Sequence, residues 1–81
     1  MRVKIRLFAS LREAVGQGEL DLDLPAAATA EDAWQNLART SQALGERRGG
    51  LLASINRRYA SFDTPLAEGD EVVFIPPVSG G

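Results

Sequence analysis

The chain has 81 residues, of which 44% are hydrophobic and 25% are charged, and its formal net charge is -2. This length suffices for one domain with a modest core, and the apolar content is typical of a folded protein rather than a disordered one. With 9 basic and 11 acidic residues, the chain lacks the basic excess that binding to a phosphate backbone requires, which argues against a nucleic-acid partner.

Two residue types with common catalytic roles are missing from the sequence, which contains no cysteine and no histidine. Their absence excludes disulfides, thiol nucleophiles, imidazole acid–base catalysis and most zinc sites. The basic residues near the N-terminus alternate with apolar ones, whereas a signal peptide would have a continuous apolar segment after them. No stretch of about 20 apolar residues could span a bilayer, so we expect a cytoplasmic protein without a membrane partner.

The N-terminal segment alternates apolar and basic residues, which predicts a half-buried strand over residues 2–9. Phe8 falls by parity on the basic face, where it is either partly exposed or covered by the segment that follows. Residues 10–13 have the form of a capping box, so a short helix is expected over 11–15. Gly16 is expected to end this helix in a left-handed conformation.

A strict alternation of leucine and acidic residues predicts a second strand over 19–24. Its acids are expected to form a solvated face, because side chains on one face of a single strand do not converge on a metal ion. Thr29 is a candidate N-cap for the next helix, with Asp32 at its third position. Apolar residues then follow at helical spacing, namely Ala30, Ala33, Trp34, Leu37 and Ala38. This is expected to be the main helix, with its tryptophan in the core.

The C-terminal half begins with a predicted surface connection over 40–50, which includes one extra helical turn. Short strands are expected over 51–56 and 59–62, and the final strand over 71–75. Two pairs of adjacent arginines are predicted to be solvated, with docking to another protein as the second interpretation; they are Arg47-Arg48 and Arg57-Arg58.

Parity gives the final strand two different faces. If Val72 and Phe74 point to the core, Ile75 points to the opposite side of the sheet. Together with Phe8 and Tyr59, it would form an exposed apolar patch of the kind that marks protein contacts. The order of strands and helices predicts an α+β fold, in which one main helix packs on one face of a mixed sheet.

The last residues, 76–81, are predicted to be a flexible tail that follows a domain of residues 1–75. Two consecutive prolines favour an extended backbone that projects from the domain. Gly80 and Gly81 have no side chains, so a partner could enclose this backbone in a narrow channel. We therefore expect the α-carboxyl group of Gly81 to be the reactive group, and the alternative is a frayed end without function.

Five motifs are spread along the chain: Ser10-Leu11-Arg12-Glu13 with Gly16, Leu51–Asn56, Ser61-Phe62-Asp63 with Pro65-Leu66, Gly69–Val72, and Pro76–Gly81. Their joint occurrence resembles the small subunits of molybdopterin synthase, which are sulfur carriers with a ubiquitin-like β-grasp fold. The resemblance covers essentially the whole chain, and it implies the same fold here.

The resemblance also implies a reaction. In that family a separate adenylating enzyme uses ATP and magnesium to convert the terminal glycine carboxylate to an acyl-adenylate. Sulfur from a donor then replaces the adenylate and gives a thiocarboxylate. The large synthase subunit receives the tail, and the sulfur passes to cyclic pyranopterin monophosphate in molybdenum cofactor biosynthesis. This chain would then be the sulfur-donating subunit, not catalytic alone and without a bound cofactor of its own.

Roles for individual residues follow from the resemblance. Gly81 would carry the sulfur. The residues that would thread the partner's channel are Pro76, Pro77, Val78, Ser79 and Gly80. Docking to the adenylating enzyme and the large subunit would use Phe8, Tyr59 and Ile75.

Two alternatives to a molybdopterin synthase subunit remain open from the sequence, and the first is a carrier or modifier that acts in another pathway. Similar β-grasp proteins supply sulfur for thiamine or for tRNA thiolation, and others are attached to lysines as protein modifiers. The other alternative is a β-grasp binding module whose tail is inert.

Overall fold

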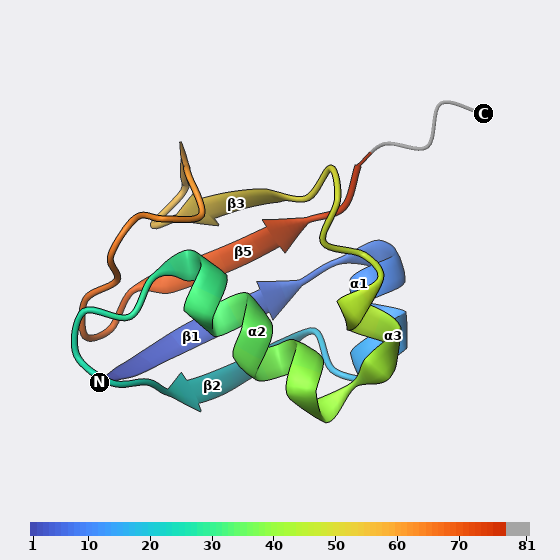
Figure 1. Cartoon of the computed structure of the whole chain (residues 1–81), viewed down its shortest axis with the longest axis horizontal. Helices are drawn as coiled ribbons and strands as arrows, with labels where there is room; N and C mark the ends of the chain where they lie inside the picture. Colours follow the sequence, from blue (N-terminus) through green and yellow to red (C-terminus); the bar gives the residue numbers. More distant parts are fainter. Residues whose placement is uncertain (78–81) are drawn as a thin grey trace.

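A computed structural model describes residues 1–77 of the chain. Five strands form a single mixed sheet in the order β2-β1-β5-β3-β4, and the helices cover one of its faces (Figure 1). The predicted α+β fold with one main helix on a mixed sheet is confirmed. No helix in this part of the chain is long and apolar enough to cross a membrane.

The N-terminal half follows the predicted order. Strand β1 (Arg2–Leu7) leads into helix α1 (Ala9–Val15), and strand β2 (Glu19–Asp23) returns antiparallel to β1. Gly16 ends α1 with φ of 88°, and its N–H donates to the carbonyl oxygen of Arg12 over 2.8 Å. The predicted left-handed end of this helix is confirmed, because glycine adopts positive φ without steric cost.

The predicted capping box at Ser10 is wrong. Helix α1 begins one residue earlier than Ser10, after Phe8 as N-cap, and no side chain caps it. The carbonyl oxygen of Phe8 accepts from the N–H groups of Leu11 and Arg12 at 3.1 and 3.4 Å. Ser10 therefore lies inside the first turn, where its hydroxyl group cannot act as an N-cap.

The main helix α2 (Ala30–Thr40) has Thr29 as its N-cap, as predicted, and the structure shows that Thr29 and Asp32 form a full capping box. The Thr29 hydroxyl oxygen accepts from the N–H of Asp32 at 3.2 Å, and the Asp32 carboxylate accepts from the N–H of Thr29 at 2.9 Å. The extra turn predicted in the following connection is α3 (Gln42–Gly45). Figure 1 shows α2 crossing the sheet, with α1 and α3 together near one end of it.

The C-terminal strands are β3 (Leu52–Ile55), β4 (Arg58–Ala60) and β5 (Glu71–Ile75), the last with the predicted bounds. Strand β3 ends before the predicted residue 56, because Asn56 and Arg57 form a two-residue hairpin turn with φ of 52° and 71°. Both values are positive, as a turn that matches the twist of an antiparallel pair requires. Strand β4 begins one residue before the predicted residue 59 and ends at Ala60.

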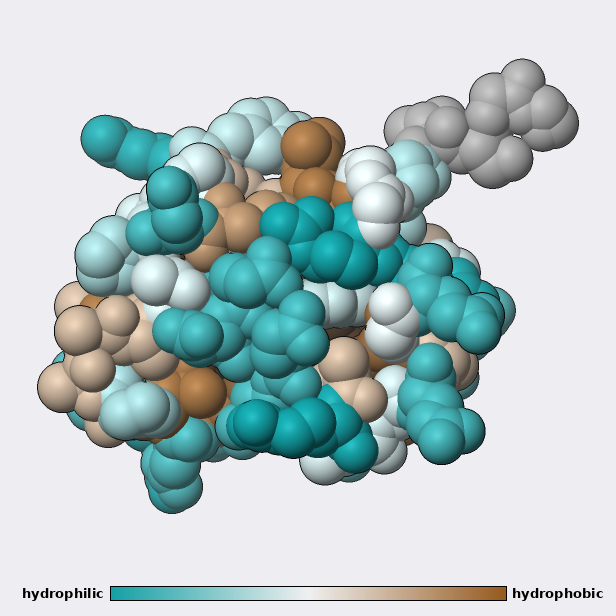
Figure 2. All heavy atoms as spheres, viewed as in Figure 1, coloured by the Kyte–Doolittle hydropathy of each residue, from teal (hydrophilic) through white to brown (hydrophobic). Residues whose placement is uncertain are grey.

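The core lies between α2 and the sheet. Trp34 is fully buried, and its ring meets that of Phe74 edge to face with 5.2 Å between the centroids. The alternating residues Val3, Ile5 and Leu7 of β1 are also buried, as their parity predicts. The side of the sheet that faces away from α2 is called the outer face below. Figure 2 views the molecule from the helix side, where hydrophilic residues predominate over α2.

Candidate functional site

The predicted tail follows the central strand of the sheet. Strand β5 pairs in parallel with β1, with Leu7 beside Phe74, and antiparallel with β3, with Leu52 opposite Ile75. Neither Pro76 nor Pro77 has an N–H group with which to continue the ladder. The chain therefore leaves the sheet from a strand that is bonded on both sides, so the point of departure is firmly held.

The predicted carrier residue lies outside the part of the chain that the structure describes. The same holds for three of the residues predicted to thread a partner's channel, which are Val78, Ser79 and Gly80. The predictions for these residues and for Gly81 stay predictions. Of the other two channel residues, Pro76 is half-buried and Pro77 is exposed.

The three predicted docking residues share the outer face. Ile75 has parity opposite to the buried Phe74, and Phe8 has parity opposite to the buried Leu7. Because Leu7 pairs with Phe74 in a parallel ladder, Phe8 comes at the level of Ile75. Tyr59 pairs with Ser54 across the hairpin and is 76% exposed, while Phe8 is 48% exposed. Their predicted role in docking stays a prediction.

The structure adds two apolar residues to this face. Leu52 is 51% exposed and stands opposite Ile75, and Val73 is half-buried and stands opposite Ser54. Neither residue was given a docking role in the sequence-based prediction. Parity could have identified Leu52, since it alternates with the buried Leu51 and Ala53. We call the set the outer-face apolar surface; its members are Phe8, Leu52, Tyr59, Val73 and Ile75.

The other half of the outer face is charged. Acids of β2 stand opposite basic residues of β1, with Arg2 beside Asp23 and Lys4 beside Asp21 in the register. Arg2 Nε lies 3.1 Å from Asp23 Oδ1, and this hydrogen bond, together with the arginine charge, lowers the pKa of Asp23. Arg6 lies within 3.8 Å of both Glu19 and Glu71. The predicted solvated face of β2 is therefore a row of cross-strand ion pairs.

The boundary between the two halves runs along β1 and β5. The Arg6 guanidinium lies 5.8 Å from the centroid of the Phe8 ring, so the basic row meets the outer-face apolar surface at that aromatic. A partner that covers this surface would meet apolar side chains above β5, β3 and β4, with charges on one flank. Such an apolar centre with a polar flank is typical of protein contact sites.

The family model described as the ThiS family matches residues 5–81. The molybdopterin synthase sulfur carrier subunit of Escherichia coli (strain K12) is 45% identical over 98% of this chain and 99% of its own length. Small archaeal modifier protein 1 of Haloferax volcanii is 36% identical over 94% of this chain and 97% of its own length.

Solved structures agree with the β-grasp fold. The crystal structure of small archaeal modifier protein 1 from Haloferax volcanii superposes with a TM-score of 0.87 at 28% identity, over 95% of this chain and 98% of that one. A chain from the complex of subunits 1 and 2 of molybdopterin-converting factor from Helicobacter pylori superposes with a TM-score of 0.68 at 22% identity, over the full length of both chains. The predicted ubiquitin-like fold and the family resemblance are both confirmed, and the chain is a member of the ThiS family.

Proposed function

We propose that this chain is the sulfur carrier subunit of a molybdopterin synthase. The observation that carries the proposal is the 45% identity to the Escherichia coli sulfur carrier subunit, which extends over 98% of the chain. The family match also runs through Gly81, so it includes the Gly-Gly end that the chemistry needs.

The reactive group in this proposal is the α-carboxylate of Gly81. A carboxylate resists nucleophilic attack until one of its oxygens becomes a good leaving group. An adenylating partner supplies this activation with ATP and magnesium, giving an acyl-adenylate and releasing diphosphate. Sulfur from a donor then replaces AMP at the acyl carbon and leaves a thiocarboxylate. The chain needs no side-chain nucleophile for these steps, which is consistent with a sequence that has no cysteine and no histidine.

The described part of the chain supports this role in two ways. The tail follows strand β5, which lies at the centre of the sheet and is hydrogen-bonded to both β1 and β3. The outer-face apolar surface lies at the same end of β5, because Phe8, Leu52 and Ile75 are neighbours in the register. A partner that docks on this surface would therefore lie close to the departing chain. The proposed partners are the adenylating enzyme and the large synthase subunit, which transfers the sulfur to cyclic pyranopterin monophosphate.

Mass spectrometry tests the proposal directly. The intact protein is incubated with an adenylating enzyme from the same host, ATP, magnesium and a sulfur donor. We expect the mass to rise by the replacement of one oxygen by sulfur, and no such rise in a variant without Gly81 or with one residue added after it. The variants should keep the circular dichroism spectrum of the parent. An unchanged mass of the parent protein would rule out every carrier role.

A second candidate function is attachment to other proteins. The likeness to small archaeal modifier protein 1, at 36% identity and a TM-score of 0.87, favours this candidate. Both functions begin with activation of the same carboxylate, and they differ in the group that attacks the acyl carbon. An isopeptide adduct on lysines of other proteins, found in the same experiment without thiocarboxylate, would favour the modifier.

A further inference from the structure

The hairpin between β3 and β4 ends in two arginines. Asn56 and Arg57 form its turn, and Arg58 begins β4, which is an edge strand of the sheet. All three side chains are exposed. Figure 1 shows the segment that follows β3, in gold and orange, at an edge of the molecule away from α1 and α3. We call residues 56–58 the hairpin tip; it presents two positive charges where another molecule can reach them.

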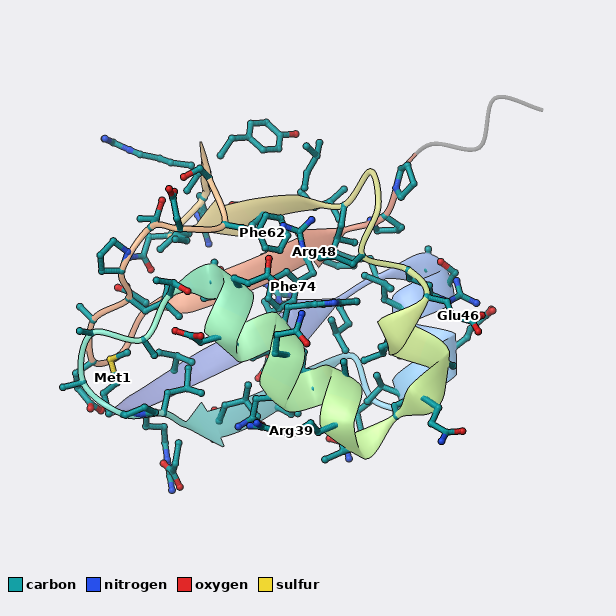
Figure 3. The ribbon with its side chains drawn as sticks, viewed as in Figure 1. Met1, Arg39, Glu46, Arg48, Phe62 and Phe74 are labelled. Atoms are coloured by element: carbon teal, nitrogen blue, oxygen red, sulfur yellow. The ribbon has the colours of Figure 1, made fainter. Side chains whose placement is uncertain are left out.

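The two arginine pairs of the chain differ in what holds them. Arg48 is used within the fold, because its Nε and Nη2 atoms both lie 2.8 Å from Glu31 Oε1 and its guanidinium carbon lies 3.5 Å from the centroid of the Phe62 ring. Figure 3 shows Arg48 beside Phe62, between α2 and the sheet. By contrast, neither Arg57 nor Arg58 makes an ion pair with any residue from 1 to 77.

The two acids that border the hairpin tip already have partners. Asn56 Nδ2 donates to Asp70 Oδ1 at 2.8 Å, and the N–H of Glu71 donates to Asn56 Oδ1 at 3.0 Å. The second oxygen of Asp70 accepts from the N–H of Ala67 at 2.8 Å. The Glu71 carboxylate lies 3.8 Å from the Arg6 guanidinium. The hairpin tip is therefore firmly attached to the start of β5, but its positive charge is not balanced by these neighbours.

Arg57 occupies a position that favours glycine. Its φ is 71°, and a two-residue turn with positive φ at both positions is most often Asn-Gly. An arginine there lowers stability, because its Cβ atom crowds the backbone in the left-handed region. The side-chain hydrogen bonds of Asn56 offset the strain at the first turn residue. No ion pair within residues 1–77 does the same for Arg57, and strain of this kind is found preferentially at functional positions.

The hairpin tip continues into the outer-face apolar surface at Tyr59. This tyrosine is 76% exposed and follows Arg58 directly. Arg58 pairs with Ile55, which packs on the core, so Arg58 and Tyr59 lie on opposite sides of the hairpin. On the opposite flank of the sheet, the basic residues of β1 are neutralised by acids of β2. The apolar surface thus has paired charges on one side and unpaired positive charge on the other.

We propose that the hairpin tip is a cationic contact for a protein partner whose surface carries carboxylates beside an apolar area, an inference that rests on the proposed function. The partner is the one that covers the outer-face apolar surface, and its carboxylates face Arg57, with Arg58 adding to the same positive field. The net charge of -2 gives the chain no general attraction to acidic proteins, so the attraction is local. Charges at the rim of an interface speed association and fix orientation.

Arg57→Gly tests the proposal with two readouts of opposite sign. Glycine adopts the positive φ without strain, so the urea midpoint should rise. The same substitution removes the charge, so binding of the partner should weaken. Ala27→Gly is the matched control, because Ala27 is also exposed and has φ of 69°. This variant should raise the urea midpoint and bind like the unsubstituted protein.

Binding is measured by surface plasmon resonance with the adenylating enzyme and with the large synthase subunit, each in turn. With at least one of them, Arg57→Gly should raise Kd by about threefold to fivefold at low salt, since exposed charge pairs contribute up to about 1 kcal/mol. Most of this change should be a slower association rate, and it should shrink as salt is added. Parent-like affinity of Arg57→Gly for both proteins would overturn the proposal.

A charge reversal shows whether the contact is local. Arg57→Glu should weaken binding more than Arg57→Gly does. Arg47→Glu changes the net charge equally at an exposed arginine that makes no ion pair within residues 1–77, and it should bind like the unsubstituted protein. Equal losses from the two reversals would mean that only net charge matters, which would overturn a contact at the hairpin tip.

Two further outcomes separate this inference from others. Sedimentation of the unsubstituted protein alone should show a monomer at low salt. A salt-sensitive dimer that Arg57→Gly abolishes would place a second copy on the hairpin tip, and would overturn the proposed occupant. If the unsubstituted protein bound neither the adenylating enzyme nor the large subunit, the proposed function would fail and this inference with it. Binding that is unaffected by Arg57→Gly would refute this inference alone.

Discussion

Leu52 stands directly opposite Ile75 in the antiparallel ladder between β3 and β5, and both side chains lie on the outer face. Opposite residues in such a ladder have Cβ atoms about 4.5–5.5 Å apart, so the two side chains form one continuous apolar area. This pair lies beside the point where the chain leaves the sheet. Leu52 is therefore as well placed as the predicted docking residues to contact a partner of the tail.

Leu52→Asp should weaken binding of the proposed partners by about 30-fold or more, because an apolar residue at the centre of an interface contributes about 2 kcal/mol or more. Calorimetric titration with the adenylating enzyme measures the effect. Ala43→Asp adds the same charge at an exposed residue of α3, away from the outer face, and should bind like the parent. Parent-like affinity of Leu52→Asp would remove Leu52 from the docking surface.

Thr29 and Ser10 make a matched pair for helix capping, since the sequence predicted both as caps and only Thr29 is one. Thr29→Ala should lower the free energy of unfolding by about 1 kcal/mol, because the N–H of Asp32 loses its acceptor. Ser10→Ala should leave it unchanged or raise it slightly, because alanine favours a helix interior. Urea titrations followed by circular dichroism compare the two. Equal losses would show that Ser10 does cap α1.

Trp34 is the chain's only tryptophan and is fully buried against Phe74. Trp34→Ala should cost about 3–5 kcal/mol, because it leaves a large cavity at the centre of the core. A domain of this length has a total stability of only about 4–12 kcal/mol, so this variant should be largely unfolded or close to it. Trp34→Phe should keep the fold and should lower the free energy of unfolding by less than Trp34→Ala does.

The burial of Trp34 also predicts the fluorescence of the unsubstituted protein. Its tryptophan emission should be blue-shifted in the native state and should move to longer wavelength in one step with urea. A native emission maximum like that of free tryptophan would contradict the burial of Trp34.

The ion pair between Glu31 and Arg48 predicts a dependence of stability on pH. The hydrogen bond from Arg48, followed by that from Gln35, lowers the pKa of Glu31 below its usual value of 4.5 in the folded protein. The stabilisation is therefore fully present above the unfolded pKa and is lost as the pH falls through the lowered folded pKa. Both side chains are about a third exposed, so the contribution at neutral pH should not exceed about 1 kcal/mol.

Glu31→Gln removes the titrating group and keeps its size. Between about pH 5 and about pH 3, the unfolding free energy of the parent should fall more steeply than that of this variant. Glu13→Gln serves as control, because Glu13 is exposed and makes no ion pair with the described residues 1–77. If the parent and Glu31→Gln lost stability in parallel, the ion pair would not contribute.

Local patterns in the sequence were sufficient wherever neighbouring residues decide the structure. The bounds of β5, the N-cap at Thr29 and the end of α1 at Gly16 were all predicted, because alternation, side-chain caps and positive φ act over a few residues. The same reasoning failed at Ser10, where the start of the helix is set by the carbonyl oxygen of Phe8 at the end of β1.

Only the tertiary structure decided which strands are neighbours. The order β2-β1-β5-β3-β4 brings Leu52 beside Ile75 and places Gly50 against Pro77, although more than 20 residues separate the members of each pair. No short pattern encodes such pairings, because they depend on how α2 packs the whole sheet into one core. The sequence by itself thus determined the elements and the Gly-Gly end, and the packing of the sheet determined what surrounds the chain where it leaves the domain.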